Sequence, residues 1–117
     1  MNGALYKILS AAEWRAAQGS GVVAWSAADL GDGFMHLSTY GQALETARRH
    51  FSGRKDLVAL EIDASRVAGA LRLEPSCGGD LFPHLYGELS VDAVLRVRPL
   101  AEDAAGGFRF VDGGGKP

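Results

Sequence analysis

The chain has 117 residues, of which 47% are hydrophobic, so it can form one domain with a buried core and without disulfide or metal support. Its 12 lysines and arginines nearly balance 14 aspartates and glutamates, and this balance argues against nucleic acid or an anionic membrane as a partner. The single cysteine, Cys77, excludes an internal disulfide. With no signal peptide and no apolar run of roughly 20 residues, the sequence predicts a soluble, cytoplasmic protein.

The N-terminal residues predict a strand followed directly by a helix. The run Ala4–Leu9 is apolar apart from Lys7, as in a strand. Ser10 and Glu13 have the spacing of a capping box, which predicts a helix over residues 11–18.

The next segment predicts short extended pieces around a loop. Residues 22–25 are expected to be extended, and residues 28–33 contain two glycines and two aspartates, a composition typical of a turn-rich loop. A second strand is expected over residues 34–38. Alternation along such a strand places His36 and Ser38 on the same face.

A second helix is predicted after this strand, with Thr39 or Ser38 as its cap. Its apolar residues recur at helical spacing, and they are Ala43, Leu44, Ala47 and Phe51. His50 lies near the C-terminal end of this helix, where a positive charge is favourable, and is expected to be structural.

The second half of the chain predicts mainly strands. Residues 57–62 are almost uninterruptedly apolar, which indicates a central strand covered on both faces. Residues 64–67 predict one helical turn and residues 71–73 another strand. Pro75 is expected to end regular pairing because it lacks an amide donor, which leaves residues 76–83 as an irregular loop.

The last strands are expected over residues 91–100, with Arg96 and Arg98 on the outer face, and at the sheet edge over residues 108–111. Because strands outnumber helices and the two occur in mixed order, the predicted fold is α+β with a bent or split, mostly antiparallel sheet.

We expect residues 1–112 to form this single small domain. Residues 113–117, which are three glycines, a lysine and a proline, are expected to form a flexible C-terminal tail.

His36 and Ser38 form the first candidate site. An imidazole and a hydroxyl on one face suit the binding of a sugar hydroxyl, an amide or a phosphate. The alternative is that His36 is a half-buried strand residue, and that Ser38 and Thr39 only cap the following helix.

The second candidate site is His84, Tyr86 and Glu88, which extended geometry places on one side. An imidazole, a phenol and a carboxylate that share a pocket with His36 can orient a substrate and stabilise a developing positive charge. Alternatively, His84 bonds a backbone carbonyl, Tyr86 packs in the core and Glu88 is solvated.

Glu74 and Asp80 flank the glycine-rich loop and are further candidate carboxylates, one of which Arg72 can neutralise. A nucleophilic Cys77 assisted by His84 is an open alternative. Metal binding is not predicted, because the three histidines are far apart and none belongs to a closely spaced ligand pair.

Four motifs between Tyr6 and Leu100 carry a family resemblance. They are YKIL at residues 6–9, DGFMHLST at residues 32–39, LEP at residues 73–75 and GDLFPHLYG at residues 79–87. Together they resemble the bacterial family called domain of unknown function 952. That family is similar in motif layout to the ADP-ribosyltransferase fold, in which a split sheet holds NAD in a central cleft.

The resemblance implies that His36, with Ser38 or Thr39, meets the ribose and nicotinamide of NAD. It also implies that Tyr86 stacks on the bound ring, with Asp80 among the binding residues.

The same resemblance implies catalytic roles for His36 and His84, with Glu74 or Glu88 as the acid. Glu74 fits the family pattern, whereas other members often carry proline at the position of Glu88.

NAD is thus implied as a substrate and a small molecule as the ligand, with no oligomeric state predicted. Related RNA phosphotransferases use histidines to move a phosphate onto NAD, which is a second possible chemistry. The alternative to any enzyme is a non-catalytic domain that binds a small metabolite or a protein.

Overall fold

The computed structural model describes residues 3–111. The helices are α1 (Ala11–Ser20), α2 (Ala27–Asp32) and α3 (Tyr40–Phe51). The strands are β1 (Leu5–Ser10), β2 (Val22–Val23), β3 (Met35–His36), β4 (Ser38–Thr39), β5 (Leu57–Ile62), β6 (Leu71–Ser76), β7 (Asp80–Leu85), β8 (Leu89–Ser90), β9 (Val94–Glu102) and β10 (Phe108–Phe110).

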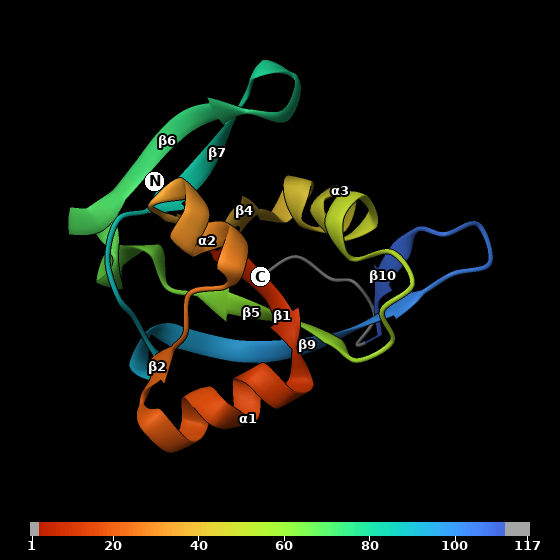
Figure 1. Ribbon diagram of the computed structural model, residues 1–117, viewed down its shortest axis with the longest axis horizontal. Coiled ribbons are helices and arrows are strands. Elements are labelled where there is room, and N and C mark those ends of the chain that lie inside the picture. The colour runs from red at the N-terminus through yellow and green to blue at the C-terminus, as the bar shows by residue number, and fades with distance from the viewer. Residues whose placement is uncertain (1–2, 112–117) are drawn as a thin grey trace.

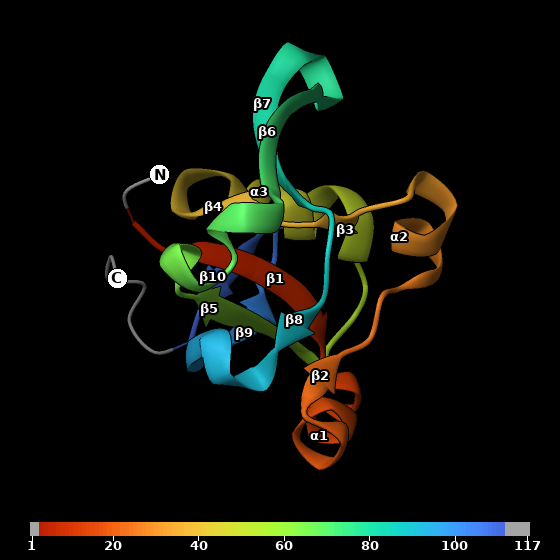
Figure 2. The same ribbon diagram turned by 90° about the vertical axis from the view of Figure 1, so that its left-hand side faces the viewer.

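The strands form three antiparallel sheets. The largest has the order β10-β9-β5-β1-β4, a second has the order β3-β7-β6, and β2 pairs with β8. The β6–β7 hairpin projects from the body at the end opposite α1 (Figures 1 and 2). The expectation of a small α+β domain with a bent or split antiparallel sheet is confirmed.

The central strands β1 and β5 are buried on both faces. Leu5 and Leu9 of β1 face one hydrophobic cluster, which also contains Leu60 of β5 and packs against Trp14 of α1. Tyr6 and Ile8, on the other face of β1, belong to a second cluster that also contains residues of α3 and β10. The prediction that residues 57–62 form a central, doubly covered strand is confirmed, since all six are buried.

Local signals define the first and third helices correctly. Ser10 Oγ accepts from the Glu13 amide while the Glu13 carboxylate accepts from the Ser10 amide, so α1 begins with the predicted capping box. Gly21 ends α1 in the left-handed conformation with φ +90°. The helix predicted to follow a cap at Thr39 or Ser38 is α3, whose N-cap is Thr39. The edge strand predicted over residues 108–111 is β10.

The loop predicted over residues 28–33 is wrong, because most of it is helix α2. A second capping box, in which Ser26 and Asp29 exchange amide hydrogen bonds, begins this helix. Gly33 ends it with φ +85°, so this glycine is a C-cap and not part of an open loop.

The single strand predicted over residues 34–38 is also wrong. The chain changes sheets at Leu37, whose amide donates to Pro83 O, so β3 and β4 belong to different sheets. The alternation that put His36 and Ser38 on one face therefore does not hold.

Pro75 does not end regular pairing, and residues 76–83 are not an irregular loop. β6 continues through Pro75, which lies opposite Leu81 of β7, and Ser76 lies opposite Asp80. Proline is tolerated here because β6 is the edge strand of its sheet, where a missing amide need not break a ladder.

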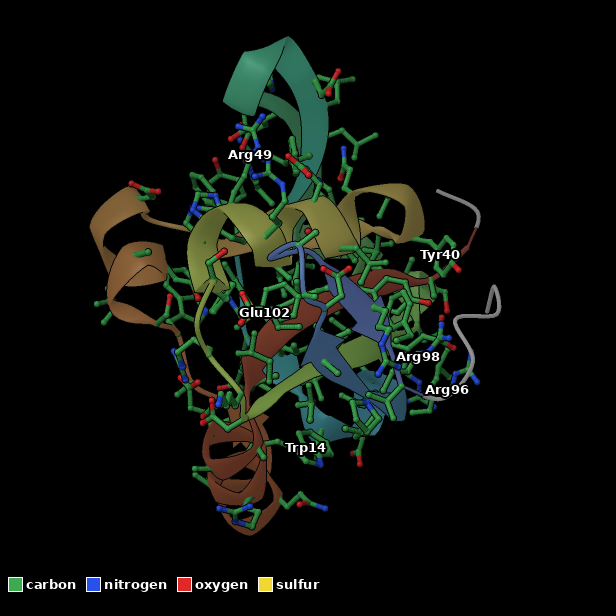
Figure 3. The ribbon with its side chains drawn as sticks, turned by 90° about the vertical axis from the view of Figure 1, so that its right-hand side faces the viewer. Trp14, Tyr40, Arg49, Arg96, Arg98 and Glu102 are labelled. Carbon is green, nitrogen blue, oxygen red and sulfur yellow. The ribbon has the colours of Figure 1, made fainter. Side chains whose placement is uncertain are left out.

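The strand predicted over residues 91–100 is β9, which begins three residues later, at Val94, after a short 3₁₀ turn. Arg98, labelled in Figure 3, is not on an outer face but is among the most buried side chains. Its guanidinium lies over the Phe110 ring, 4.1 Å from the ring centre. Arg98 also lies beside Tyr6. The Tyr6 hydroxyl donates to the buried Glu61, and Glu61 pairs with Arg96 as well. The expected tail, residues 113–117, lies outside the described residues.

Candidate functional site

The structure brings His36 and His84 together on paired strands. They lie directly opposite each other across β3 and β7, with ring centroids 6.0 Å apart. The Phe34 ring contacts both imidazoles: it stacks on His84 at 3.9 Å and lies 4.7 Å from His36. Because strand pairing fixes this arrangement, the two imidazoles share one rigid site.

His36 is held between two aspartates of α2. Its Nδ1 lies 2.6 Å from Asp29 Oδ1, and its Nε2 lies 2.8 Å from Asp32 Oδ2. The His36 amide donates to the same Asp29 oxygen at 3.0 Å. With 37% of its side chain exposed, His36 is both oriented by the protein and accessible to a ligand.

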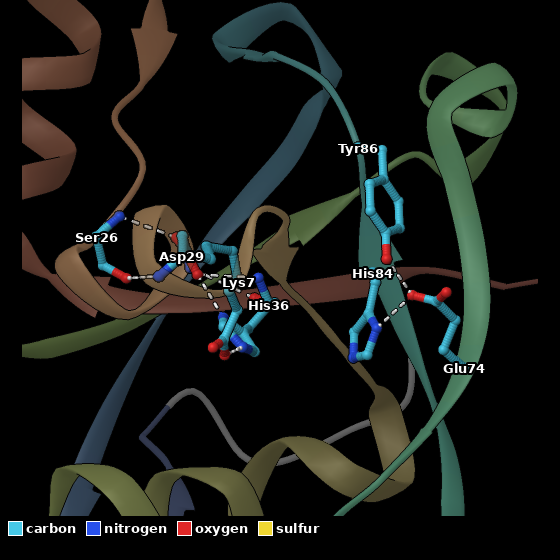
Figure 4. Close-up of polar contacts among 8 residues, drawn as sticks. Lys7, Ser26, Asp29, His36, Glu74, His84 and Tyr86 are labelled. Atoms are coloured by element: carbon cyan, nitrogen blue, oxygen red, sulfur yellow. Dashed lines mark hydrogen bonds and ion pairs between the residues drawn. The ribbon is translucent and has the colours of Figure 1, made fainter.

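Asp29 lies at the centre of this arrangement, between Ser26, Lys7 and His36 (Figure 4). Only 1% of its side chain is exposed. Lys7 Nζ lies 2.9 Å from Asp29 Oδ2, and the Ser26 amide donates to the same oxygen. Burial by itself raises the pKa of Asp29, but the charge of Lys7 and the hydrogen bonds from Lys7, His36 and Ser26 lower it from 3.8 to about 2. Asp29 is therefore ionised throughout the neutral range.

A second carboxylate, Glu74, holds His84 and Tyr86. His84 Nδ1 lies 2.8 Å from Glu74 Oε1, and the Tyr86 hydroxyl donates to that same oxygen at 2.6 Å. The hydrogen bond from Tyr86, and to a smaller extent the one from His84, lower the pKa of Glu74. The same bond to Glu74 raises the pKa of Tyr86. The Arg72 guanidinium lies 4.9 Å from the centre of the Tyr86 ring. His84 is buried, so Glu74 and Tyr86 provide the accessible part of this cluster.

The remaining predicted residues lie elsewhere. Ser38 is buried and donates to Thr46, and the Thr39 amide donates to Gln42 at the start of α3. Glu88 lines an open depression with Arg66.

Asp80 is four residues before His84 on β7, which corresponds to about 13 Å along a strand. Of the predicted residues, the structure thus joins His36, His84, Tyr86 and Glu74. Those placed apart from them are Ser38, Thr39, Asp80 and Glu88.

Sequence reasoning missed Asp29, Lys7 and Phe34. A lysine within an apolar strand was a usable signal, since a buried ammonium requires an acidic partner. The spacing of Ser26 and Asp29 was a second signal, because it is the capping-box pattern recognised at Ser10.

The accessible groups of this site are imidazole, carboxylate and phenol, which can exchange hydrogen bonds with hydroxyls and transfer protons. Among residues 3–111, no group of three or more histidine, cysteine, aspartate and glutamate side chains is placed to hold a metal ion. No helix in the described part of the chain is long and apolar enough to span a membrane.

Comparison with known proteins identifies similar sequences and structures. The model of the family described as Protein of unknown function (DUF952) matches residues 8–97. The crystal structure of the protein CC0527 from Caulobacter crescentus is similar to this structure with a TM-score of 0.85 and a sequence identity of 47%. The match covers 91% of this chain and 93% of the CC0527 chain. The solution NMR structure of CC0527 gives a TM-score of 0.79 and a sequence identity of 48%, over 89% of this chain and 90% of the CC0527 chain. No curated protein matches the chain.

Proposed function

Because the chain belongs to the DUF952 family, which is described only by its unknown function, we propose a function from the site itself. In this proposal the protein is an ADP-ribosyltransferase-like domain that binds NAD or another ADP-ribose-containing ligand at the site of His36, His84 and Tyr86, where His36, Tyr86 and Glu74 contact the ligand and the buried His84 supports Glu74. The observation that supports it is the pairing of the two histidines across β3 and β7, with Phe34 against both rings.

The exposed chemistry of the site suits the nicotinamide ribose. His36 can donate hydrogen bonds to ribose hydroxyls or accept them, and the Glu74 carboxylate can accept them. The partly exposed Tyr86 ring offers a surface for stacking. The nicotinamide ring of NAD carries a positive charge, which the neighbouring carboxylates of Asp32 and Glu74 favour. Arg72 is an exposed cation beside Tyr86 and suits the phosphates.

Glu74 suits the role of stabilising the reacting sugar. Its hydrogen bonds from Tyr86 and His84 lower its pKa, so it carries a negative charge at neutral pH. In the proposed transfer, the bond between nicotinamide and ribose C1′ breaks, nicotinamide leaves with the electron pair, and an acceptor nucleophile forms the new bond to C1′. Glu74 stabilises the positive charge on the ribose, and His36 accepts the proton of the attacking nucleophile.

Calorimetric titration with NAD, ADP-ribose and nicotinamide tests the binding. We expect His36→Ala to abolish binding and leave the unfolding midpoint nearly unchanged. His50→Ala is the matched control, because His50 is exposed on α3, and it should bind as the unchanged protein does. Absence of binding to the unchanged protein at millimolar ligand would refute the proposal.

Arg72→Met separates recognition of the phosphates from recognition of the riboside. This variant should bind nicotinamide mononucleotide more weakly than the unchanged protein but bind nicotinamide riboside, which has no phosphate, equally well. Equal affinity of both proteins for both compounds would rule out Arg72 as the phosphate contact.

A non-catalytic binding domain is the second candidate, and one observation favours it. Glu74 Oε1 already accepts hydrogen bonds from His84 and Tyr86, and Glu88 lies in a separate depression. This candidate predicts that NAD binds without release of nicotinamide. Chromatographic measurement of nicotinamide released by the protein and by Glu74→Gln distinguishes the two: an enzyme releases it and the variant does so far more slowly.

A further inference from the structure

We infer that Lys7 and Asp29 are positioning residues that fix His36 so that its Nε2 meets the ligand, and that Asp32 occupies Nε2 until the ligand displaces it. The inference rests on the proposed function of this site. It concerns which contacts hold the His36 ring in place and how its Nε2 becomes available to the ligand.

The Nδ1 side of His36 is built as a permanent contact. Asp29 Oδ1 accepts both from the His36 amide and from Nδ1, while Asp29 Oδ2 is held by Lys7 and by the Ser26 amide. Asp29 and Lys7 are buried, so a ligand cannot reach them without unfolding this part of the protein. Breaking such a buried pair leaves an uncompensated charge, which strongly disfavours any rearrangement on this side.

The Nε2 side has the opposite character. Asp32 is 57% exposed and is the last residue of α2, followed by Gly33 in the left-handed conformation. A carboxylate at this place gains little from an ion pair in water, so a ligand group can replace it at small cost. Nε2 is therefore the exchangeable contact of His36.

The protonation of Asp29 defines what Nε2 can do. Since Asp29 is ionised, it accepts hydrogen bonds only, and Nδ1 must carry the proton that it receives. In a neutral ring Nε2 then has a lone pair, which repels Asp32 but accepts a hydrogen bond from a ligand hydroxyl. In a protonated ring Nε2–H can donate to Asp32, which lies 2.8 Å away, and an acceptor group of the ligand can take the place of Asp32.

The positioning step can be tested without any ligand. Nitrogen-15 NMR of the ring nitrogens, with His36 assigned by loss of its signals in His36→Gln, reports which nitrogen of the neutral ring carries the proton. We expect the proton on Nδ1, with an Nδ1–H resonance far downfield because of the 2.6 Å bond to Asp29. The exposed His50 should show no such resonance. A neutral His36 ring with its proton on Nε2 would overturn the inference whatever the ligand proves to be.

The double variant Lys7→Met/Asp29→Leu removes the positioning pair and leaves no unpaired buried charge. Its His36 should lose the downfield resonance. Its affinity for NAD and ADP-ribose should fall roughly ten- to hundredfold, the loss typical when the partner that orients a ligand-binding histidine is removed. Unchanged affinity would show that the pair is only structural.

Asp32→Ala tests the displacement step. It should bind NAD and ADP-ribose more tightly than the unchanged protein, because the ligand no longer competes with a carboxylate for Nε2. Weaker binding would overturn the inference, since Asp32 would then contact the ligand itself. If neither compound binds the unchanged protein, the proposed function fails, whereas the NMR result still decides whether His36 is held through Nδ1.

Discussion

Acid should destabilise the protein in part through Asp29, and the size of that effect follows from the structure. The pKa of Asp29 falls from 3.8 to about 2 on folding, because the pairing with Lys7 and His36 outweighs the cost of burial. Since a tenfold change in proton affinity is worth about 1.4 kcal/mol, the lowered pKa corresponds to about 2 kcal/mol of folding free energy. This stabilisation is complete above about pH 4 and is lost as the pH falls through 2, because the unfolded chain takes up the proton first.

The double variant Lys7→Met/Asp29→Leu isolates this contribution. Between pH 5 and pH 2, we expect the unchanged protein to lose about 2 kcal/mol more of its free energy of unfolding than the variant loses. Urea unfolding followed by circular dichroism, at steps over this pH range, measures both losses. Every other carboxylate is common to both proteins, so their difference belongs to Asp29. Parallel curves over this range would refute the reasoning, because Asp29 would then titrate alike in the folded and unfolded chains.

Glu45 provides a contrasting control, since its pKa is also lowered to about 2, by hydrogen bonds from Arg48 and Arg49. All three side chains are exposed on α3, so this interaction is screened by salt. In about 0.5 M salt the curves of Glu45→Gln and the unchanged protein should converge. The difference due to the buried Asp29 should persist in the same salt.

Three further substitutions test the packing around the site and the core, each by thermal and urea unfolding. Gly87→Ala should destabilise the protein by about 1 kcal/mol or more, because a Cβ at Gly87 would lie 3.1 Å from Ala70 Cβ. Gly41→Ala should instead stabilise it by about 0.5 to 1 kcal/mol, since Gly41 is in α3 and a Cβ there meets nothing within 4 Å. Tyr6→Phe should lose about 1 to 3 kcal/mol, because the buried Glu61 loses a hydrogen bond from the Tyr6 hydroxyl. A stabilised Gly87→Ala or a neutral Tyr6→Phe would contradict these packing arguments.

The parts of the fold that the sequence predicts are those specified within a few residues. Helix α1 follows from Ser10 and Glu13, and strand β5 from its continuous apolar run. The same local logic fails at α2 only because the two glycines were given more weight than the Ser26–Asp29 capping box. That error hid Asp29, the residue that orients His36.

The parts that the sequence does not predict depend on long-range contacts. Nothing near Leu37 indicates that its amide bonds Pro83, yet this contact moves the chain from one sheet to another and separates His36 from Ser38. The extension of β6 through Pro75 likewise depends on its position at a sheet edge. Opposite each other across β3 and β7, His36 and His84 are 48 residues apart, so their pairing was a hypothesis that only the fold could test.

Lys7 on β1 and Glu61 on β5 are the buried charges of the two central strands, and they show what a charged residue in an apolar strand predicts. Each lies within an apolar strand and faces a different hydrophobic cluster, and each is paired: Lys7 with Asp29, and Glu61 with Arg96 and Tyr6. A charge in a doubly buried strand therefore predicts an opposite partner but not where in the sequence that partner lies. The Lys7 pair differs from the other in that Asp29 also binds an imidazole that remains partly exposed. Glu61 also has a partly exposed third partner, the Arg96 guanidinium, so a third partner alone does not separate a binding site from a structural pair. What distinguishes Asp29 is the kind of partner, because an imidazole can both donate and accept a hydrogen bond whereas a guanidinium can only donate.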